Sequence, residues 1–170
     1  MRINLIYDMS NNIKDILVIF LVSLVLGLSR SIIIGDISII KYPIEEISDE
    51  ELVEANLDGP KIIKIDQCKK MYDAGNTLFV DARDSLLFIE GHISGAVNIH
   101  FESHDDDIIL EKLDGIDYDD FIIIYCSGGN CDLSEELGNH LFEYLSYRNI
   151  LLYEGGYSEW EKNGYPVIYE

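Results

Sequence analysis

From residue 61 onward, short apolar runs rich in β-branched residues alternate with stretches whose apolar residues recur at helical spacing. This pattern predicts strands at 62–65, 77–81, 96–99, 121–125 and 149–153, and helices at 66–74, 85–90, 105–113, 134–147 and 158–162. Residues 121–125 are apolar throughout, which is typical of a central parallel strand buried on both faces. Strands that alternate with helices form a parallel sheet, because each connecting helix packs on a face of that sheet. The sequence therefore predicts an α/β domain over residues 61–170.

A second constraint is the uncharged apolar run from Ile16 to Leu28. As a helix, this run is about 20 Å long, which is shorter than the hydrocarbon core of a bilayer at roughly 30 Å. Continuing the helix to Ile34 gives about 28 Å, with Arg30 close enough to one end for its side chain to reach the headgroups. We therefore predict a single transmembrane helix over residues 13–34 that contacts the lipid bilayer through residues 16–34.

The segments around this helix are predicted to be an N-terminal flank over residues 1–12 and an acidic juxtamembrane linker over residues 35–60. Two alternatives remain open for the apolar run itself. A cleaved signal peptide would use the small residues Gly27 and Ser29, although the long leader carries Asp8. A buried core helix would suit a segment that is apolar on every side. No cysteine lies near the run, which excludes a lipoprotein anchor.

Lysine and arginine residues flank both ends of the apolar run, with a slight excess on the N-terminal side. The positive-inside rule therefore leans weakly toward a cytoplasmic N-terminus. In that orientation, the α/β domain of this single-pass membrane protein would lie outside the cytoplasm.

The charge of the chain limits its partners. The formal net charge is −20 at pH 7, and the sequence pI is about 4.3. Such a field repels phosphate backbones, so we expect no nucleic-acid partner. Hydrophobic residues make up 48% of the chain, which excludes global disorder. The three cysteines are too few for a disulfide scaffold and allow at most one intramolecular bridge.

The end of the 121–125 strand carries the strongest chemical signal. Cys126 follows this strand directly, and Gly128 and Gly129 come next, before a helix that begins near Leu133. Ligands of parallel sheets bind beyond the carboxyl ends of the strands. A glycine-rich turn at a helix N-terminus presents successive backbone N–H groups to an anion, and it favours the thiolate of a nearby cysteine. The residues themselves therefore point to covalent chemistry at Cys126.

Four collinear blocks resemble the rhodanese-like (sulfurtransferase) domain family. They are Val80–Asp84 (VDARD), Gly91–Ile99 (GHISGAVNI), Tyr125–Cys126 with the following glycines, and Glu154–Val167 with its two glycines, tryptophan and GYPV ending. The resemblance covers about residues 61–170. It implies a three-layer α/β fold with an about five-stranded, mainly parallel sheet and helices on both faces. Single anchored domains of this type resemble bacterial proteins, which implies a bacterial inner membrane.

The resemblance also implies a persulfide mechanism without a cofactor or a metal. Cys126 would attack the outer sulfur of thiosulfate or of another sulfane donor, and a thiol acceptor or cyanide would then remove that sulfur. The backbone N–H groups expected to cradle the sulfur belong to Ser127, Gly128, Gly129, Asn130 and Cys131.

One position departs from the family pattern. The family loop commonly has an arginine five positions after the nucleophile, and here that position is Cys131, followed by Asp132. Without that arginine we expect weaker activity toward thiosulfate than toward a neutral or thiol-bound donor. Cys131 is a candidate resolving thiol for Cys126, and the alternative is a small residue in the first turn of the helix. Phosphatase relatives with this fold need an arginine that grips phosphate, and position 132 is an aspartate, so we exclude that activity.

Other candidate residues have modest roles. Arg83 is expected either to pair with Asp81 or to face the mouth of the active site and contact the donor. Cys68 is expected to be a half-buried packing residue, and His92 to bond a backbone group of its loop. The histidines at positions 100, 104 and 140 share no ligand spacing with the loop cysteines, so we expect no zinc site.

Three functional hypotheses follow. The first is a membrane-anchored sulfurtransferase that uses Cys126. The second is a non-catalytic rhodanese-like module that docks an unidentified protein partner or senses sulfide or redox state. The third is a dithiol–disulfide oxidoreductase that uses Cys126 and Cys131.

Overall fold

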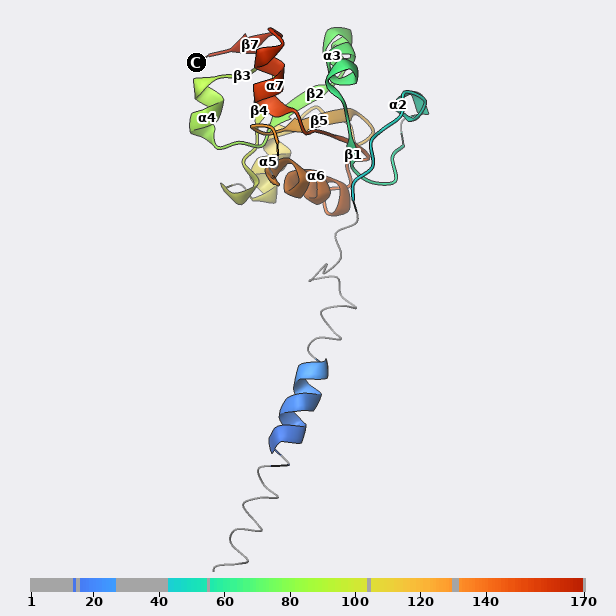
Figure 1. Ribbon diagram of the computed structural model, residues 1–170, viewed down its shortest axis with the longest axis vertical. Coiled ribbons are helices and arrows are strands. Elements are labelled where there is room, and N and C mark those ends of the chain that lie inside the picture. Colours follow the sequence, from blue (N-terminus) through green and yellow to red (C-terminus); the bar gives the residue numbers. More distant parts are fainter. Residues whose placement is uncertain are drawn as a thin grey trace, which may run out of the picture. The chain divides into compact units, whose positions relative to one another are not determined.

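The computed structural model describes residues 14, 16–26, 43–54, 56–103, 105–129 and 132–169 (Figure 1). The chain divides into two units, Met1–Pro43 and Ile44–Glu170. In the first unit, residues 16–26 form a helix whose apolar side chains are exposed. In the described part of the chain, no helix has the length and apolarity needed to cross a membrane. The predicted span over 13–34 is therefore not found there, and most of its remaining residues lie outside the described ones.

The second unit is built on a five-stranded parallel sheet with the strand order β1-β6-β5-β2-β4. The strands are β1 (Lys61–Ile62), β2 (Leu78–Asp81), β4 (Val97–Asn98), β5 (Phe121–Tyr125) and β6 (Asn149–Tyr153). The predicted parallel α/β sheet is thus confirmed, with β5 at its centre as its apolar sequence indicates. All the carboxyl ends of these strands lie at one edge of the sheet, and this edge carries Asp81 and Cys126.

Helices cover both faces of this sheet, which completes the three layers. They are α3 (Ile65–Ala74) and α7 (Gly156–Lys162) on one face, and α5 (Asp106–Lys112) and α6 (Leu133–Glu143) on the other (Figure 1). Side chains of β5 alternate between the two cores, with Ile122 and Ile124 facing α5 and α6. Ile123 and Tyr125 face the other layer, where Trp160 is fully buried. The period of two along a strand thus divides a uniformly apolar segment between two cores.

Four short elements, two strands and two helices, were not predicted from the sequence. Strand β3 (His92–Ile93) pairs antiparallel with β7 (Val167–Ile168) to form a separate two-stranded sheet. The other two are helix α2 (Glu51–Glu54) and the 3₁₀ helix η1 (Phe101–Ser103), whereas α4 (Ser85–Glu90) has its predicted bounds. Strands of two residues leave no detectable alternation, and their pairing depends on a partner far away in the sequence.

The predicted helix over 134–147 is too long. Helix α6 ends at Glu143, and Ser146 has a φ of 65°, which a helix cannot accommodate. Tyr147 is buried and its N–H donates to the carbonyl oxygen of Leu141. The chain therefore turns earlier than its leucine spacing suggests, so that Tyr147 can enter the core beneath α6.

The folded unit begins at Ile44, whereas the sequence predicts a linker up to residue 60. Ile47 and Leu57 are buried in the core that contains Trp160. The N–H of Ile47 donates to the carbonyl oxygen of Ile62 at 2.8 Å, and the N–H of Ile62 donates to the carbonyl oxygen of Glu45 at 2.8 Å. Residues 45–47 thus extend the edge of the sheet beside β1, and the described residues from Ile44 onward belong to the domain.

Candidate active site

The active-site loop leaves β5 at Cys126 and is fastened to the beginning of α7. The N–H of Tyr157 donates to the carbonyl oxygen of Cys126 at 2.8 Å. The N–H and the hydroxyl of Ser158 both donate to the carbonyl oxygen of Ser127, at 3.2 and 2.6 Å. Because the first N–H groups of a helix have no partner within the helix, α7 can donate them to these carbonyls without losing bonds of its own. The loop and α7 therefore form one hydrogen-bonded structure.

Two glycines allow this close approach. Gly128 has a φ of 107° and Gly156 a φ of 61°, a region that other residues rarely adopt. A Cβ atom on Gly128 would meet the carbonyl oxygen of Gly155. A Cβ atom on Gly156 would meet the carbonyl oxygen of Cys126 and the nitrogen of Gly128. Glycine is thus required at both positions on two independent grounds, backbone conformation and space.

One of the five N–H groups expected to form a cradle is used elsewhere. The N–H of Gly129 donates to the carbonyl oxygen of Glu154 at 3.1 Å, so it does not point at a sulfur on Cys126. The N–H groups of Ser127 and Gly128 have no hydrogen-bond acceptor among the described residues. Asn130 and Cys131, the other two predicted members, lie outside the described residues. The prediction is therefore corrected at Gly129, whose N–H is used to fasten the loop.

Cys126 is almost fully buried, with 3% of its surface exposed, and it is disulfide-bonded. Cys68 is a free thiol on α3. This helix and α6 lie on opposite faces of the sheet. Cys68 has no exposed surface, and burial raises the pKa of its thiol, with the nearby charge of Glu159 adding to this effect. Cys68 is thus more buried than expected and lacks the exposed thiolate that a reactive cysteine needs.

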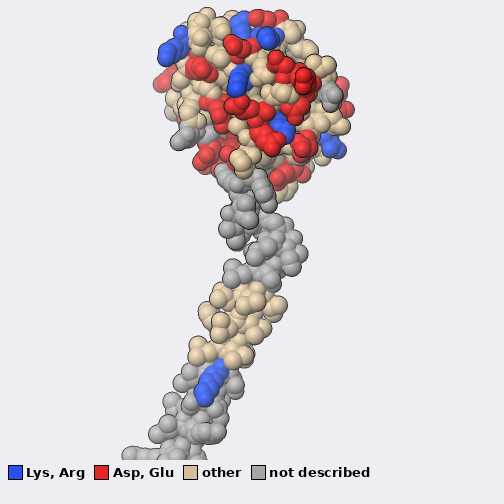
Figure 2. Space-filling view, turned by 45° about the vertical axis from the view of Figure 1, so that its right-hand side comes forward, with Lys and Arg blue, Asp and Glu red and all other residues tan. Residues whose placement is uncertain are grey.

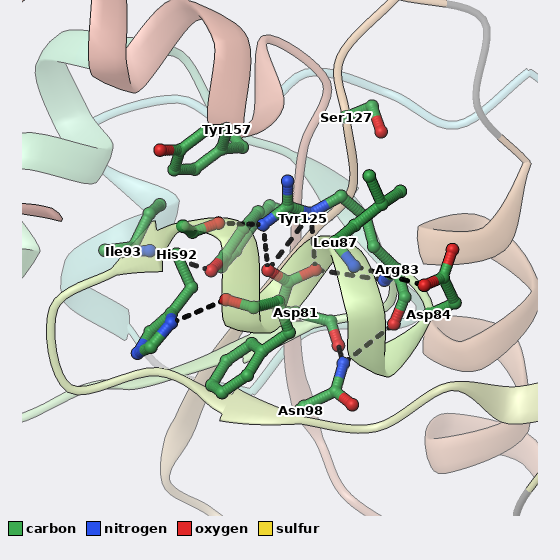
Figure 3. A network of polar contacts seen from close by, with 12 residues as sticks. Asp81, Arg83, Asp84, Leu87, His92, Ile93, Asn98, Tyr125, Ser127 and Tyr157 are labelled. Carbon is green, nitrogen blue, oxygen red and sulfur yellow. Dashed lines mark hydrogen bonds and ion pairs between the residues drawn. The ribbon is translucent and has the colours of Figure 1, made fainter. Parts of the chain in front are cut away.

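Beside the loop lies a buried ion pair between the end of β2 and the following turn (Figure 3). Arg83 and Asp81 are 4% and 0% exposed, respectively. The Arg83 Nη2 donates to Asp81 Oδ2 at 2.6 Å and to the carbonyl oxygen of Gly91 at 2.7 Å. The Arg83 Nε donates to Asp81 Oδ1 at 2.9 Å. The sequence-predicted pairing of Arg83 with Asp81 is thus present.

Aromatic rings enclose the Arg83 guanidinium. Its Cζ atom lies 4.4 Å from the centroid of the Tyr157 ring and 6.0 Å from that of Tyr125. Burial alone would lower the pKa of Arg83, but its hydrogen bonds to Asp81 and the charge of Asp81 raise the pKa overall. The guanidinium is therefore positively charged at every pH at which the domain would be studied. Burial also raises the pKa of the Tyr157 hydroxyl, which keeps this ring neutral.

The surrounding loop is held to the same centre. The hydroxyl of Tyr125 accepts a hydrogen bond from the N–H of Ile93, and Asn98 Nδ2 donates to the carbonyl oxygens of Asp81 and Arg83 (Figure 3). His92 Nδ1 lies 2.9 Å from the carbonyl oxygen of Phe88. Because a carbonyl only accepts, His92 donates here, which is the backbone bond predicted for it. These contacts fix the position of the strand ends around Cys126.

Comparison with known proteins decides the family. The family model of the rhodanese-like domain matches residues 64–163. This chain belongs to the rhodanese-like domain family. The match includes the Asp81–Arg83 pair, Cys126 and the start of α7, so the rhodanese-like domain contains every residue of the site described above.

Among curated proteins, this rhodanese-like chain is similar to tRNA uridine(34) hydroxylases. The protein from Photorhabdus laumondii is 27% identical over 126 residues, which are 70% of this chain and 34% of the relative. The protein from Yersinia pestis is 27% identical over 119 residues, which are 68% of this chain and 32% of the relative. The chain thus spans about a third of the length of the curated relatives it matches.

Solved structures show the same fold. The BH2092 protein from Bacillus halodurans has a TM-score of 0.51 and 24% identity, and the match covers 62% of this chain and 74% of that one. A variant of EanB in complex with hercynine has a TM-score of 0.55 and 18% identity, over 66% of this chain and 28% of that one. These likenesses concern the fold of the rhodanese-like domain alone.

Two parts of the site were not foreseen from the sequence. The sequence identifies the glycine pair at positions 155 and 156 only as part of a family signature. The structure brings this pair into contact with the loop and shows that Ser158 fastens Ser127. The sequence gives no signal for Tyr157 either, because it is one of 11 tyrosines scattered along the chain.

The histidines form no metal centre in the described part of the rhodanese-like domain. His140 Nε2 lies 2.7 Å from Asp106 Oδ1, and the His140 ring packs against Phe101 and Tyr144. His100 Nδ1 contacts the Ser103 hydroxyl. No group of three or more histidine, cysteine, aspartate or glutamate side chains among the described residues could hold a metal ion. His104 lies outside the described residues.

Proposed function

We propose that the rhodanese-like domain is a sulfurtransferase that carries sulfane sulfur as a persulfide on Cys126 and passes it to a thiol or to cyanide. The observation that carries this proposal is the position of Cys126. It follows the central strand β5 at the carboxyl edge of the sheet, in a loop whose carbonyls are turned toward α7 by Tyr157 and Ser158. With these carbonyls occupied, the N–H groups of Ser127 and Gly128 can face the sulfur and its developing negative charge.

The reaction consists of two displacements at sulfur. The Cys126 thiolate attacks the outer sulfur of thiosulfate, a new S–S bond forms on the protein, and the S–S bond of thiosulfate breaks. The electron pair of that bond leaves with sulfite. An acceptor thiolate then attacks the outer sulfur of the protonated persulfide, which forms the acceptor persulfide and returns the Cys126 thiolate. Cyanide as acceptor would leave as thiocyanate.

Intact-protein mass spectrometry tests this proposal. The full chain in detergent would be reduced, freed of reductant and exposed separately to thiosulfate and to cysteine persulfide. We expect a gain in mass of one sulfur atom, which cyanide removes, and no gain in the Cys126→Ser variant. A Cys68→Ser variant should gain sulfur like the wild type, since Cys68 is buried in another layer. No gain in the wild type with either donor would leave a non-catalytic binding module instead.

The similarity to tRNA uridine(34) hydroxylases does not extend this proposal to tRNA. The chain spans about a third of these relatives, at 27% identity. Its net charge of −20 opposes contact with a phosphate backbone. We therefore expect no shift of a tRNA transcript in a native gel at physiological salt. A salt-sensitive complex with tRNA would contradict this expectation and would favour a tRNA substrate, as in the hydroxylase relatives.

A dithiol redox role is the second candidate, because Cys126 is disulfide-bonded in the structure. The chain has three cysteines and Cys68 is a free thiol. We propose that Cys131 is the partner of Cys126, and that the two thiols are reversibly oxidised when a disulfide substrate is reduced. In that exchange, the loop loses two protons and two electrons, and the substrate disulfide gains them and becomes two thiols.

Titration of free thiols at defined glutathione ratios separates the two functions. A redox role predicts the reversible loss of two thiols in the wild type. It also predicts no such loss in Cys126→Ser or Cys131→Ser. Sulfur transfer predicts instead that the Cys131→Ser variant still gains one sulfur atom. If Cys131→Ser loads sulfur normally and the wild type shows no reversible oxidation, the redox role is excluded.

We also propose that residues 13–34 anchor the domain to a bacterial inner membrane, with the domain outside the cytoplasm. The support is the uncharged run from Ile16 to Leu28 and the exposed apolar side chains of the helix over 16–26. Wild-type protein should stay with membranes after alkaline carbonate extraction. The double variant Leu21→Lys/Leu24→Lys should be released, whereas Val53→Lys, which changes an exposed residue of the folded unit, should not. Release of the wild type by carbonate would refute the anchor.

A further inference from the structure

We propose that Arg83 binds the donor, and that its Nη1 group selects sulfur donors that carry an oxyanion beside the transferable sulfur. This inference rests on the proposed sulfurtransferase function and deepens it. It assigns to Arg83 the anion contact that the loop itself lacks, since the residues from Cys126 to Gly129 carry no cation and Cys131 stands where the family commonly has arginine.

The guanidinium is held rigidly in one orientation. Its Nε and Nη2 groups are bound by both oxygens of Asp81, and Nη2 is bound also by the carbonyl oxygen of Gly91. Tyr157 stacks on it at 4.4 Å from its ring centroid. An arginine that is fixed on two of its nitrogens loses little further entropy when the third one binds a ligand.

The third nitrogen, Nη1, is open to a ligand. Nη1 of Arg83 makes no hydrogen bond to any described residue, although Arg83 is only 4% exposed. Figure 3 shows this nitrogen turned away from Asp81, toward the side of the site where Tyr157 and Ser127 lie. Thr77 Oγ1 is the only buried side-chain nitrogen or oxygen atom of the described residues that lacks a partner, so Nη1 of Arg83 reaches solvent. A ligand that enters the site can therefore displace water from this charged donor.

The Arg83 guanidinium lies beside two residues that adjoin Cys126. Its Cζ is 6.0 Å from the Tyr125 ring centroid and 4.4 Å from that of Tyr157. Arg83 is two residues after Asp81, which is in register with Tyr125, the residue before Cys126. The N–H of Ala82 donates to the carbonyl oxygen of Tyr125, and the N–H of Tyr157 donates to that of Cys126. The guanidinium thus lies among the residues that flank the nucleophile in sequence and in space.

The form of the site indicates the class of donor. Two N–H groups of Nη1 suit an oxyanion, as in the sulfonate end of thiosulfate or the carboxylate of cysteine persulfide. The Tyr157 ring, 4.4 Å from the guanidinium, gives this site one apolar side (Figure 3). Because Asp81 balances the positive charge of Arg83, the donor would be recognised through directed hydrogen bonds and not through net charge. With thiosulfate, these bonds would also stabilise the sulfite that leaves with the electron pair of the broken S–S bond.

The first experiment does not depend on sulfur transfer. Alkylation of Cys126 would be measured with iodoacetate, an anion, and with neutral iodoacetamide, using the reduced full chain in detergent with the Cys131→Ser substitution. In each reaction the thiolate displaces iodide. The ratio of the two rate constants reports an anion contact, while the iodoacetamide rate alone reports whether the loop is intact.

We expect Arg83→Met to lower the iodoacetate-to-iodoacetamide ratio about tenfold, the effect of losing one charge-assisted hydrogen bond. The double variant Asp81→Asn/Arg83→Met removes both charges and avoids leaving a buried carboxylate unpaired, and it should show the same loss. Arg148→Met is the matched control, because Arg148 is exposed and precedes β6 at the opposite edge of the sheet. An unchanged ratio in both Arg83 variants would overturn the proposal.

The second experiment identifies the donor. The kcat/KM values for thiosulfate, cysteine persulfide and an uncharged organic trisulfide would be compared in wild type and in Asp81→Asn/Arg83→Met. A selective loss with thiosulfate assigns Nη1 to a sulfonate, and a selective loss with cysteine persulfide assigns it to a carboxylate. Equal losses with all three donors would mean a structural role only. If no donor loads the wild type, the transferase function fails, and the alkylation ratio still decides the anion contact.

Discussion

Gly156 is the residue on which the closure of the active-site loop depends. Its φ of 61° lets the chain turn from Gly155 into α7, so that the N–H groups of Tyr157 and Ser158 meet the loop carbonyls. Gly164 also has a positive φ, 71°, but no atom lies within 4 Å of where its Cβ would be. A substitution at Gly164 would therefore cause backbone strain alone, whereas one at Gly156 would cause backbone strain and a steric clash.

We expect Gly156→Ala to reduce sulfur loading of Cys126 about 100-fold, because displacement of a reacting group by about 1 Å has effects of this size. Gly164→Ala should load sulfur like the wild type. Both variants should lose about 1–3 kcal/mol of unfolding free energy from the strained backbone. Persulfide formation by mass spectrometry and denaturant unfolding measure the two effects. Equal activity of the two variants would contradict the role of α7 in fastening the loop.

Cys68 makes stability depend on alkaline pH. Burial raises the pKa of its thiol above the ordinary value of 9.0 in the folded chain. The folded state therefore holds this proton more tightly than the unfolded state. The buried, neutral thiol contributes its full share to the free energy of unfolding below pH 9, and this share is lost as the pH rises above 9. The hydroxyls of Tyr125 and Tyr153, whose pKa values burial also raises, should add to this decline above their ordinary value of 10.0.

Unfolding free energies at pH 8, 9 and 10 measure this effect. For one thiol, the slope approaches about 1.4 kcal/mol per pH unit once the unfolded form ionises. We expect Cys68→Ala to be less stable than the wild type at pH 8 because of the cavity, and to decline less steeply from pH 9 to 10. Parallel curves for the two proteins would show that the thiol ionises equally in both states.

At the scale of elements, the segment over 44–60 is a structural part of the domain. Ile47 lies in the core with Trp160, and its N–H is bonded to the chain at β1. Leu57 is buried as well, and its N–H donates to the side-chain oxygen of Asn149 at 3.3 Å. The segment therefore closes the edge of the sheet that β1 would otherwise leave open.

Ile47→Ala should lower the free energy of unfolding by about 2–4 kcal/mol, as for other large-to-small changes in a core. Val53→Ala is the control, because Val53 is 84% exposed and should change stability by less than about 0.5 kcal/mol. Urea unfolding followed by tryptophan fluorescence measures both, since Trp160 lies in the affected core. Equal stabilities would mean that the segment is only loosely attached.

At the scale of the whole molecule, acidic charge governs how a donor approaches. On the face of the folded unit in Figure 2, acidic side chains cover much of the surface and basic ones are sparse. The net charge of −20 repels a dianion such as thiosulfate before it reaches Arg83. Local hydrogen bonds and the long-range field thus act in opposite directions on anionic donors.

Because salt screens the long-range field, kcat/KM for thiosulfate should rise severalfold as ionic strength increases from about 0.01 M to about 0.15 M. An uncharged trisulfide donor should show no comparable rise. The same steady-state assay serves both donors. A fall with salt for thiosulfate would mean that a local positive field dominates, which the charge distribution of this chain does not predict.

The sequence alone determines those features that depend on neighbouring residues. Strands β5 and β6 and helix α4 have the predicted bounds, because uninterrupted apolar runs and the Asp84 cap followed by Gly91 are local signals. The parallel α/β class follows from the order of such elements. The position of Cys126 after a buried strand is equally local.

Only the tertiary structure decides which distant groups meet. The pairing of β3 with β7, the membership of residues 44–60 in the domain and the use of the Gly129 N–H by Glu154 all join segments far apart in sequence. Likewise, the sequence leaves Arg83 between two roles. The structure shows its bonds to Asp81 together with an Nη1 group that no described residue accepts from. Such contacts depend on register and packing across the whole sheet, which no local pattern of residues encodes.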